Sequence, residues 1–246
     1  MLRGRRRLAW RRKSADTGCA PMAARKNMGN FVSEILFGYT TLISIINPLG
    51  LAFVFLNKTA TLTPEERARL AYSVALNAMF LLLVTFFIGA YILHLFGISL
   101  EALRVAGGLS VAVSGWAMLN APEPHPQAQA LQQITPSMAR EMVFFPLTMP
   151  LTTGPGTVAA TIALSANRTN ELRDFLLASL ASVLITMAVA ATVYLAYSRA
   201  GTLARYLGAD GTRIVTRVSA FLLLCVGVQI MLTGLEQFLR PIIGHG

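Results

Sequence analysis

The chain has 246 residues, of which 54% are hydrophobic and only 13% are charged, and its mean hydropathy is +0.58. Water-soluble domains usually carry a charged fraction of about 25%. This composition excludes a soluble domain or a soluble enzyme and indicates a polytopic membrane protein.

Charged and histidine residues divide most of the chain into six long apolar segments of 18 to 26 residues. A transmembrane helix needs about 20 apolar residues to cross a hydrocarbon core of about 30 Å. None of the six shows the polar face at helical spacing that a buried soluble helix shows. The sequence therefore predicts an all-α protein whose six transmembrane helices cover Ile35–Asn57, Leu70–Leu93, Val105–Pro122, Met142–Asn167, Phe175–Ser198 and Val218–Leu235.

An arginine-rich arm, residues 1–30, precedes the first span and supplies much of the formal net charge of +10. Such an arm can bind anionic lipid, whereas a single aromatic residue among its basic residues, Trp10, is too little interleaving to favour nucleic acid. We expect the arm to be disordered or its start to be mis-assigned, since Met22 and Met28 are alternative start positions that would remove most of it. Lys and Arg residues are more frequent in cytoplasmic loops. Counting them without the arm predicts that both termini lie outside, and counting them with the arm predicts the reverse orientation.

Spans one and four each contain a helix-breaking motif near the middle, Asn47-Pro48-Leu49-Gly50 and Thr152-Thr153-Gly154-Pro155-Gly156. Proline has no N–H and clashes with the carbonyl four residues earlier, and glycine relaxes the backbone, so both helices should break. The carbonyls of Ser44 and Leu151 then lose their usual donors. Irregular backbone at this depth must be buried in protein or line a wet cavity, so both breaks should face inward.

The third span of each half follows an arginine, Arg104 in the first half and Arg217 in the second. We interpret the chain as an internal repeat of three plus three spans, residues 31–120 and 142–240, joined by a loop at 121–141 and followed by a tail at 241–246. Because each half has an odd number of spans, the two halves run in opposite directions through the membrane. The predicted fold is two inverted three-helix repeats with broken helices 1 and 4.

Broken helices at corresponding positions of inverted repeats are typical of a transporter's midplane site. Half-helix N-termini suit an anion and freed carbonyls suit a cation, so a small zwitterion would satisfy both. The alternative is that the Pro-Gly pairs only kink packed helices. The candidate substrate-binding residues are Ser44, Asn47, Pro48, Gly50, Thr152, Thr153, Gly154, Pro155 and Gly156.

Other polar or small residues inside or beside the spans are secondary candidates: Asn77, Arg104, Gly107, Gly108 and Gln229. The amides are also explained by hydrogen bonds between helices, and the glycines by close helix packing. Arg104 is also explained by an interfacial position or a helix-end contact.

No Asp or Glu lies inside a span, so the sequence offers no carboxylate proton relay. Sodium held by backbone carbonyls and by the hydroxyls of Ser44, Thr152 and Thr153 is the favoured ion coupling, and unassisted exchange would need no such site. With one cysteine, Cys225, inside a span, a dithiol redox carrier is not expected. We expect no enzyme activity, no cofactor and no resident metal.

The breaks and their flanking segments resemble the MarC family of bacterial inner-membrane proteins, grouped with neutral amino acid transporters and distantly with LysE-type exporters. The similarity covers about residues 30 to 240. It is carried by Asn47-Pro48-Leu49-Gly50, Phe96-Gly97-Ile98-Ser99, Leu103-Arg104-Val105-Ala106-Gly107-Gly108, Pro146-Leu147-Thr148-Met149-Pro150, Gly154-Pro155-Gly156-Thr157 and Phe221-Leu222-Leu223-Leu224-Cys225-Val226-Gly227-Val228-Gln229.

This resemblance implies a multi-pass protein of the bacterial inner (plasma) membrane that carries or exports small neutral amino acids or related metabolites. A homo-oligomer is compatible with it. The competing hypothesis is a non-transporting membrane factor, a scaffold or stress-related protein, in which the two breaks are only kinks.

Overall fold

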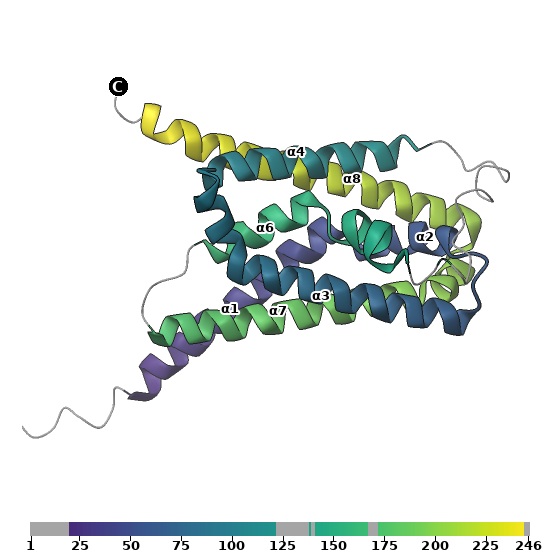
Figure 1. Cartoon of the computed structure of the whole chain (residues 1–246), viewed down its shortest axis with the longest axis horizontal. Coiled ribbons are helices and arrows are strands. Elements are labelled where there is room, and N and C mark those ends of the chain that lie inside the picture. Colours follow the sequence, from purple (N-terminus) through teal and green to yellow (C-terminus); the bar gives the residue numbers. More distant parts are fainter. Residues whose placement is uncertain (1–19, 122–137, 139–140, 167–171, 244–246) are drawn as a thin grey trace, which may run out of the picture.

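A computed structural model describes residues 20–121, 138, 141–166 and 172–243, and every regular element in those ranges is a helix (Figure 1). The irregular segment that precedes α6 is designated η1. The elements are α1 (Ala20–Ile46), α2 (Pro48–Lys58), α3 (Pro64–Leu95), α4 (Leu100–Leu119), η1 (Val143–Thr152), α6 (Pro155–Ser165), α7 (Leu172–Ser198) and α8 (Ala200–Ile243).

Five helical stretches of the described chain are long and apolar enough to cross a membrane. The remaining predicted span, Met142–Asn167, is present as two shorter apolar segments, η1 and α6, that follow one another. The polytopic all-α prediction is therefore confirmed, with the fourth span built from two pieces. The five long stretches are Phe31–Lys58, Pro64–Leu95, Leu100–Leu119, Phe175–Ser198 and Asp210–Arg240.

The two halves interlock through equivalent helices. The third helices, α4 and α8, form the most extensive contact among the described elements, and the second helices, α3 and α7, pack side by side in opposite directions (Figure 1). The contacts between halves are also reciprocal, since α6 lies against α3 and α4 while α1 and α2 lie against α7 and α8. This arrangement is the one expected of two inverted repeats.

Glycines bring the backbones of α4 and α8 into direct contact. A methyl group on Gly115 would lie 2.5 Å from the Leu224 nitrogen, and one on Gly108 would lie 2.5 Å from the Met231 nitrogen. From the other side, a methyl group on Gly227 would lie 2.3 Å from the Ala112 nitrogen. Residues with higher numbers on α8 contact residues with lower numbers on α4, so the two helices are antiparallel. Close approach of this kind is how membrane helices gain packing energy without a hydrophobic driving force between them.

The turn between α2 and α3 is held by hydrogen bonds rather than by apolar packing alone. Thr63 and Glu66 form a reciprocal capping box at the start of α3. The Arg67 guanidinium donates to the carbonyls of Thr59 (2.9 Å) and Leu62 (3.1 Å), which lie just beyond the end of α2. The second half-helix of span one is thereby fixed at its far end.

At the ends of the chain, α1 begins at Ala20, so the described helix extends into the segment 1–30 that we interpreted as an arm. The rest of that arm (residues 1–19), most of the connecting loop (122–137 and 139–140) and the last residues of the tail (244–246) lie outside the described residues. Within α8, Gly208 has φ 69° and separates a short first segment from the membrane-spanning part.

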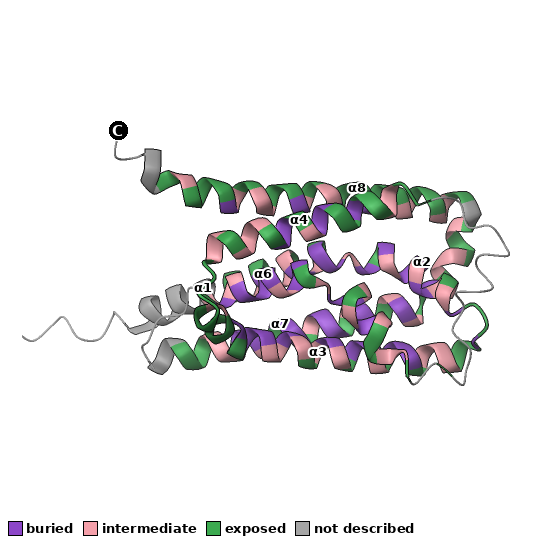
Figure 2. Cartoon of the chain, turned by 45° about the horizontal axis from the view of Figure 1, so that its top comes forward, coloured by how far each residue is buried: buried purple, intermediate pink, exposed green. Residues whose placement is uncertain are grey.

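The helix α6 lies at the centre of the bundle. Seven of its residues are buried, and Figure 2 shows that burial gathers on this helix and on the inward faces of its neighbours, while the outer faces of α3 and α8 are exposed. Span four therefore has protein on most sides, which is the environment that broken backbone requires in a membrane.

The α4–α8 contact yields the first testable prediction. The substitution Gly227→Ala should lower the free energy of unfolding by about 1–3 kcal/mol, because its methyl group must displace the backbone of α4. The matched control is Cys225→Ala on the exposed face of the same helix. Thermal unfolding in detergent micelles measures both, and equal midpoints for the two variants would contradict a tight backbone contact.

Candidate functional site

The break in span one is located at Asn47, between α1 and α2. Asn47 has φ 49° and ψ 58°, a left-handed conformation that asparagine tolerates better than most residues. Its side-chain oxygen accepts from the Gly50 amide (3.4 Å), and Pro48 occupies the first position of α2. The predicted break is therefore present, and Asn47 itself caps the half-helix that follows it.

The break in span four is wider than the motif alone predicts. Phe145 and Met149 have extended backbone angles inside η1, each directly before a proline, and Thr153 and Gly154 are non-helical before α6 begins. The residue before a proline is pushed away from helical angles, and each proline removes an amide donor. The second half-helix, α6, then starts at Pro155, the counterpart of Pro48 in α2.

Threonine hydroxyls replace some of the missing amide donors in η1. The Thr148 hydroxyl donates to the Val143 carbonyl (2.8 Å), and the Thr152 hydroxyl donates to the Leu147 carbonyl (2.8 Å). The Thr153 amide donates to the Thr148 carbonyl (2.8 Å), also five residues earlier. Two of the predicted site residues, Thr152 and Thr153, thus help to stabilise the irregular backbone. Ser and Thr often do so where membrane helices are broken.

Each break contacts the third helix of the opposite half, a few residues after the arginine that precedes that predicted span (Arg217 or Arg104). The Asn47 side-chain nitrogen donates to the Ser219 carbonyl on α8 (3.1 Å), and a methyl group on Gly50 would lie 3.0 Å from the Ser219 Cβ. Ser219 follows Arg217 by two positions. The motif of span one and the arginine segment of span six are therefore in contact.

The second break makes the reciprocal contact on α4. A methyl group on Gly156 would lie 2.0 Å from the Val111 Cγ2 and 3.1 Å from the Gly107 carbonyl oxygen. A methyl group on Gly107 would in turn lie 2.3 Å from the Ala159 Cβ on α6. The structure thus brings each broken segment against the third helix of the opposite half, in two reciprocal contacts.

Buried hydroxyl residues gather along span four. Six of the ten buried polar residues of the described chain lie in η1, α6 or the link between them: Thr148, Thr152, Thr153, Thr157, Thr161 and Ser165. They make the interior of the bundle along span four polar without a fixed charge. Such an environment suits a polar group of no net charge better than a strongly charged one.

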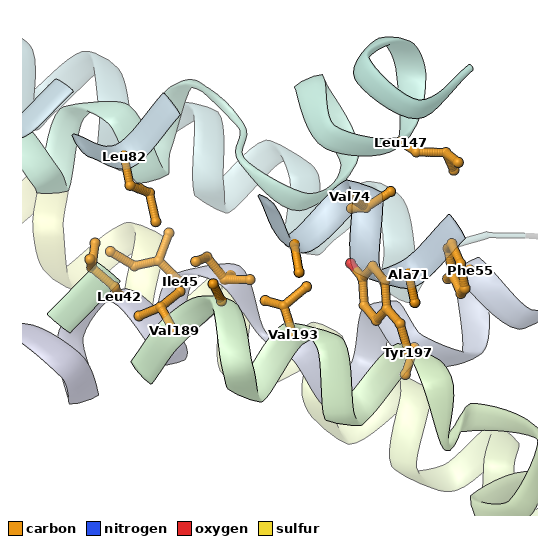
Figure 3. Close-up of a cluster of buried hydrophobic side chains, with 14 of the residues drawn as sticks. Leu42, Ile45, Phe55, Ala71, Val74, Leu82, Leu147, Val189, Val193 and Tyr197 are labelled. Atoms are coloured by element: carbon orange, nitrogen blue, oxygen red, sulfur yellow. The ribbon is translucent and has the colours of Figure 1, made fainter. Parts of the chain in front are cut away.

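Tyr197 on α7 completes this region and was missed in the sequence interpretation. Its ring stacks on Phe55 with centroids 4.6 Å apart (Figure 3). Its hydroxyl lies 3.0 Å from the Thr152 hydroxyl. Because the Thr152 proton is directed to the Leu147 carbonyl, Tyr197 must donate in this pair. A tyrosine near the end of an apolar segment usually indicates the membrane interface, so the sequence carried no signal for a buried role.

The three hydroxyls predicted to hold sodium have different environments. Ser44 is exposed and its hydroxyl donates to the Thr40 carbonyl within the same helix (2.7 Å). Thr152 is buried and already bonded, whereas Thr153 is fully buried and its hydroxyl has no partner. The structure therefore places Thr152 and Thr153 at the break in span four, and Ser44 outside that buried region.

The secondary candidates are dispersed. The Arg104 guanidinium donates to the Gln237 side chain at one end of the α4–α8 pair. Asn77 is half-buried in α3 and Gln229 is exposed on α8. Gly107 and Gly108 lie against neighbouring helices, so close packing accounts for both positions. Among the described residues, no three His, Cys, Asp or Glu side chains gather into a metal-binding group.

Comparison with known proteins identifies the chain's relatives. Residues 32–239 match the MarC family, described as MarC family integral membrane proteins. The chain is 30% identical over 219 residues to the UPF0056 inner membrane protein MarC of Salmonella typhimurium and 31% identical over 222 residues to that of Escherichia coli O1:K1. Each alignment covers 87% of this chain and 99% of the relative. No solved structure gives a significant match.

The geometry of Asn47 yields a second prediction. Asn47→Ala should lower the free energy of unfolding by about 1–2 kcal/mol, since alanine loses the cap and is strained at φ 49°. Asn47→Gly loses the same hydrogen bonds without that strain and should be less destabilised. Ser219→Ala is the control, because its backbone carbonyl still accepts from Asn47. Thermal unfolding in detergent ranks the variants, and an Asn47→Ala protein at least as stable as Asn47→Gly would refute the assignment.

Proposed function

The chain belongs to the MarC family of integral membrane proteins of the bacterial inner membrane, and from this premise we propose that it is a secondary transporter or exporter of small neutral amino acids or related metabolites. The proposed site is the region between the two broken helices. Its members are the residues of the two breaks, and no catalytic step is proposed.

One observation carries the proposal: two half-helices, α2 and α6, both begin near the middle of the bundle, each with a proline in the first position (Figure 1). Half-helix N-termini present unpaired amides and the positive end of the helix dipole. Breaks in inverted halves are the arrangement in which transporters bind solutes and expose them alternately to the two sides.

The chemistry of the region supports a solute without net charge. The buried polar residues are threonines and serines, and no Asp, Glu, Lys, Arg or His side chain is among the buried residues of the described chain. A zwitterion can use amide and hydroxyl donors at one end and carbonyl acceptors at the other without a countercharge from the protein. Sodium remains the ion we propose for coupling, since the backbone carbonyls freed at the breaks are oxygen ligands.

The proposal is tested by flux of glycine, alanine and serine into proteoliposomes under a sodium gradient, a proton gradient and neither. The double variant Asn47→Gly with Gly154→Ala should fold, because glycine adopts the left-handed backbone at position 47 and alanine adopts the extended backbone at position 154. Its flux should fall at least about tenfold. Both changes alter the half-helix N-termini at the site. Gly201→Ala, beside the flexible Arg67 side chain, is the control away from the site.

Unchanged flux in the folded double variant would reject a site at the breaks. Absence of flux for every amino acid under every gradient, with folded wild-type protein, would reject transport of this class and favour a non-transporting membrane factor.

A further inference from the structure

We infer that the two half-helix N-termini have different roles, and that the substrate's carboxylate binds at the start of α6 with the Thr153 hydroxyl as a donor. This inference rests on the proposed function. It names which end of the substrate binds to which break, and it assigns a specific recognition role to one threonine.

The start of α2 is already occupied by the protein's own side chain. The Asn47 oxygen accepts from the Gly50 amide, and its nitrogen donates to the Ser219 carbonyl on α8. A capped N-terminus has one of its free donors satisfied. A carboxylate at this end would have to compete with an asparagine that is fixed by two hydrogen bonds.

The start of α6 has no such cap. Its N-cap residue is Gly154, which has no side chain to accept a bond, and Pro155 has no amide hydrogen. The amides of Thr157 and Val158 both point to the Gly154 carbonyl, at 3.0 and 3.2 Å. Regular helix geometry supplies no partner for the Gly156 amide at the second position. This end of α6 therefore retains donor capacity and the positive end of the helix dipole.

Thr153, the residue directly before that N-cap, provides the independent observation. Its side chain is fully buried, and its hydroxyl is the one buried side-chain polar atom without a hydrogen-bond partner in the described part of the chain. The neighbouring buried threonines Thr148, Thr152 and Thr161 all donate to main-chain carbonyls. A buried hydroxyl left unpaired is unfavourable, which singles out Thr153 as a group kept for a ligand.

The combination of donors selects the chemistry of the ligand. A carboxylate has only acceptors, and it can take the Thr153 O–H and a free α6 amide at the same time. The dipole of α6 favours negative charge at this end and disfavours a cation. The same argument places the ammonium end of a zwitterion away from the α6 N-terminus.

The test uses Thr153→Val, which keeps the shape of the side chain and removes the hydroxyl. Thr153→Ser is the conservative variant, and Thr161→Val is the matched control, because Thr161 is equally buried but donates within its own helix. Initial rates of alanine uptake into proteoliposomes give KM and the maximal rate. Competition by alaninamide, which lacks the carboxylate charge, measures recognition of that group.

We expect Thr153→Val to raise KM for alanine about tenfold or more, as the loss of a hydrogen bond to a charged group does, with Thr153→Ser and Thr161→Val near wild type. The preference for alanine over alaninamide should shrink in Thr153→Val alone. Without substrate, Thr153→Val should unfold at a temperature equal to or higher than that of wild type, since it removes an unpaired buried hydroxyl.

Three results would overturn the inference. The first is wild-type kinetics in Thr153→Val, and the second is an equal loss in Thr153→Val and Thr161→Val. The third is wild-type protein that binds alaninamide as well as alanine. If wild type moves no amino acid of the panel, the proposed function fails and the inference falls with it. If wild type transports alanine but the variants do not separate, the inference alone fails.

Discussion

A peptide group in the hydrocarbon region of a bilayer must find its hydrogen-bond partner within the protein, and most of this architecture follows from that constraint. Prolines interrupt spans one and four, so both spans contain backbone that a regular helix would have satisfied. The irregular segments are accordingly placed against other helices. The Thr148 and Thr152 hydroxyls donate to η1 carbonyls, and the Asn47 side chain bonds to α2 and to α8.

The same constraint explains why the halves interlock rather than lie side by side. A break in one half can be covered only by a helix that approaches closely, and small residues permit that approach at Gly50, Gly107 and Gly156. Each break lies on the third helix of the other half, so each half covers the broken span of the other. The two breaks differ in their N-cap residues: the Asn47 side chain caps α2, whereas Gly154, which has no side chain, precedes α6.

Much of the fold could be predicted because it depends on strong local signals. Charge spacing located the apolar segments, and Pro48 and Pro155 marked the starts of both half-helices, since proline cannot continue a helix. The roles of single polar side chains could not be predicted in this way. Ser44 and Thr153 are both small hydroxyl residues beside a break, yet one is exposed and bonded to its own helix while the other is buried and unpaired. That difference arises from tertiary packing, as does the burial of Tyr197 between Phe55 and Thr152.

The glycines of the α4–α8 contact also determine where the sequence is free to vary. Two glycines on each helix recur at an interval of about two helical turns: Gly108 and Gly115 on α4, and Gly227 and Gly234 on α8. A methyl group added at any of the four would press against the neighbouring helix. Every substitution of glycine adds at least that methyl group, so no single change at these four positions is sterically neutral. The outer faces of the same helices are exposed and tolerate exchange among apolar residues. Across related proteins, the four glycines should therefore diverge more slowly than the lipid-facing residues between them.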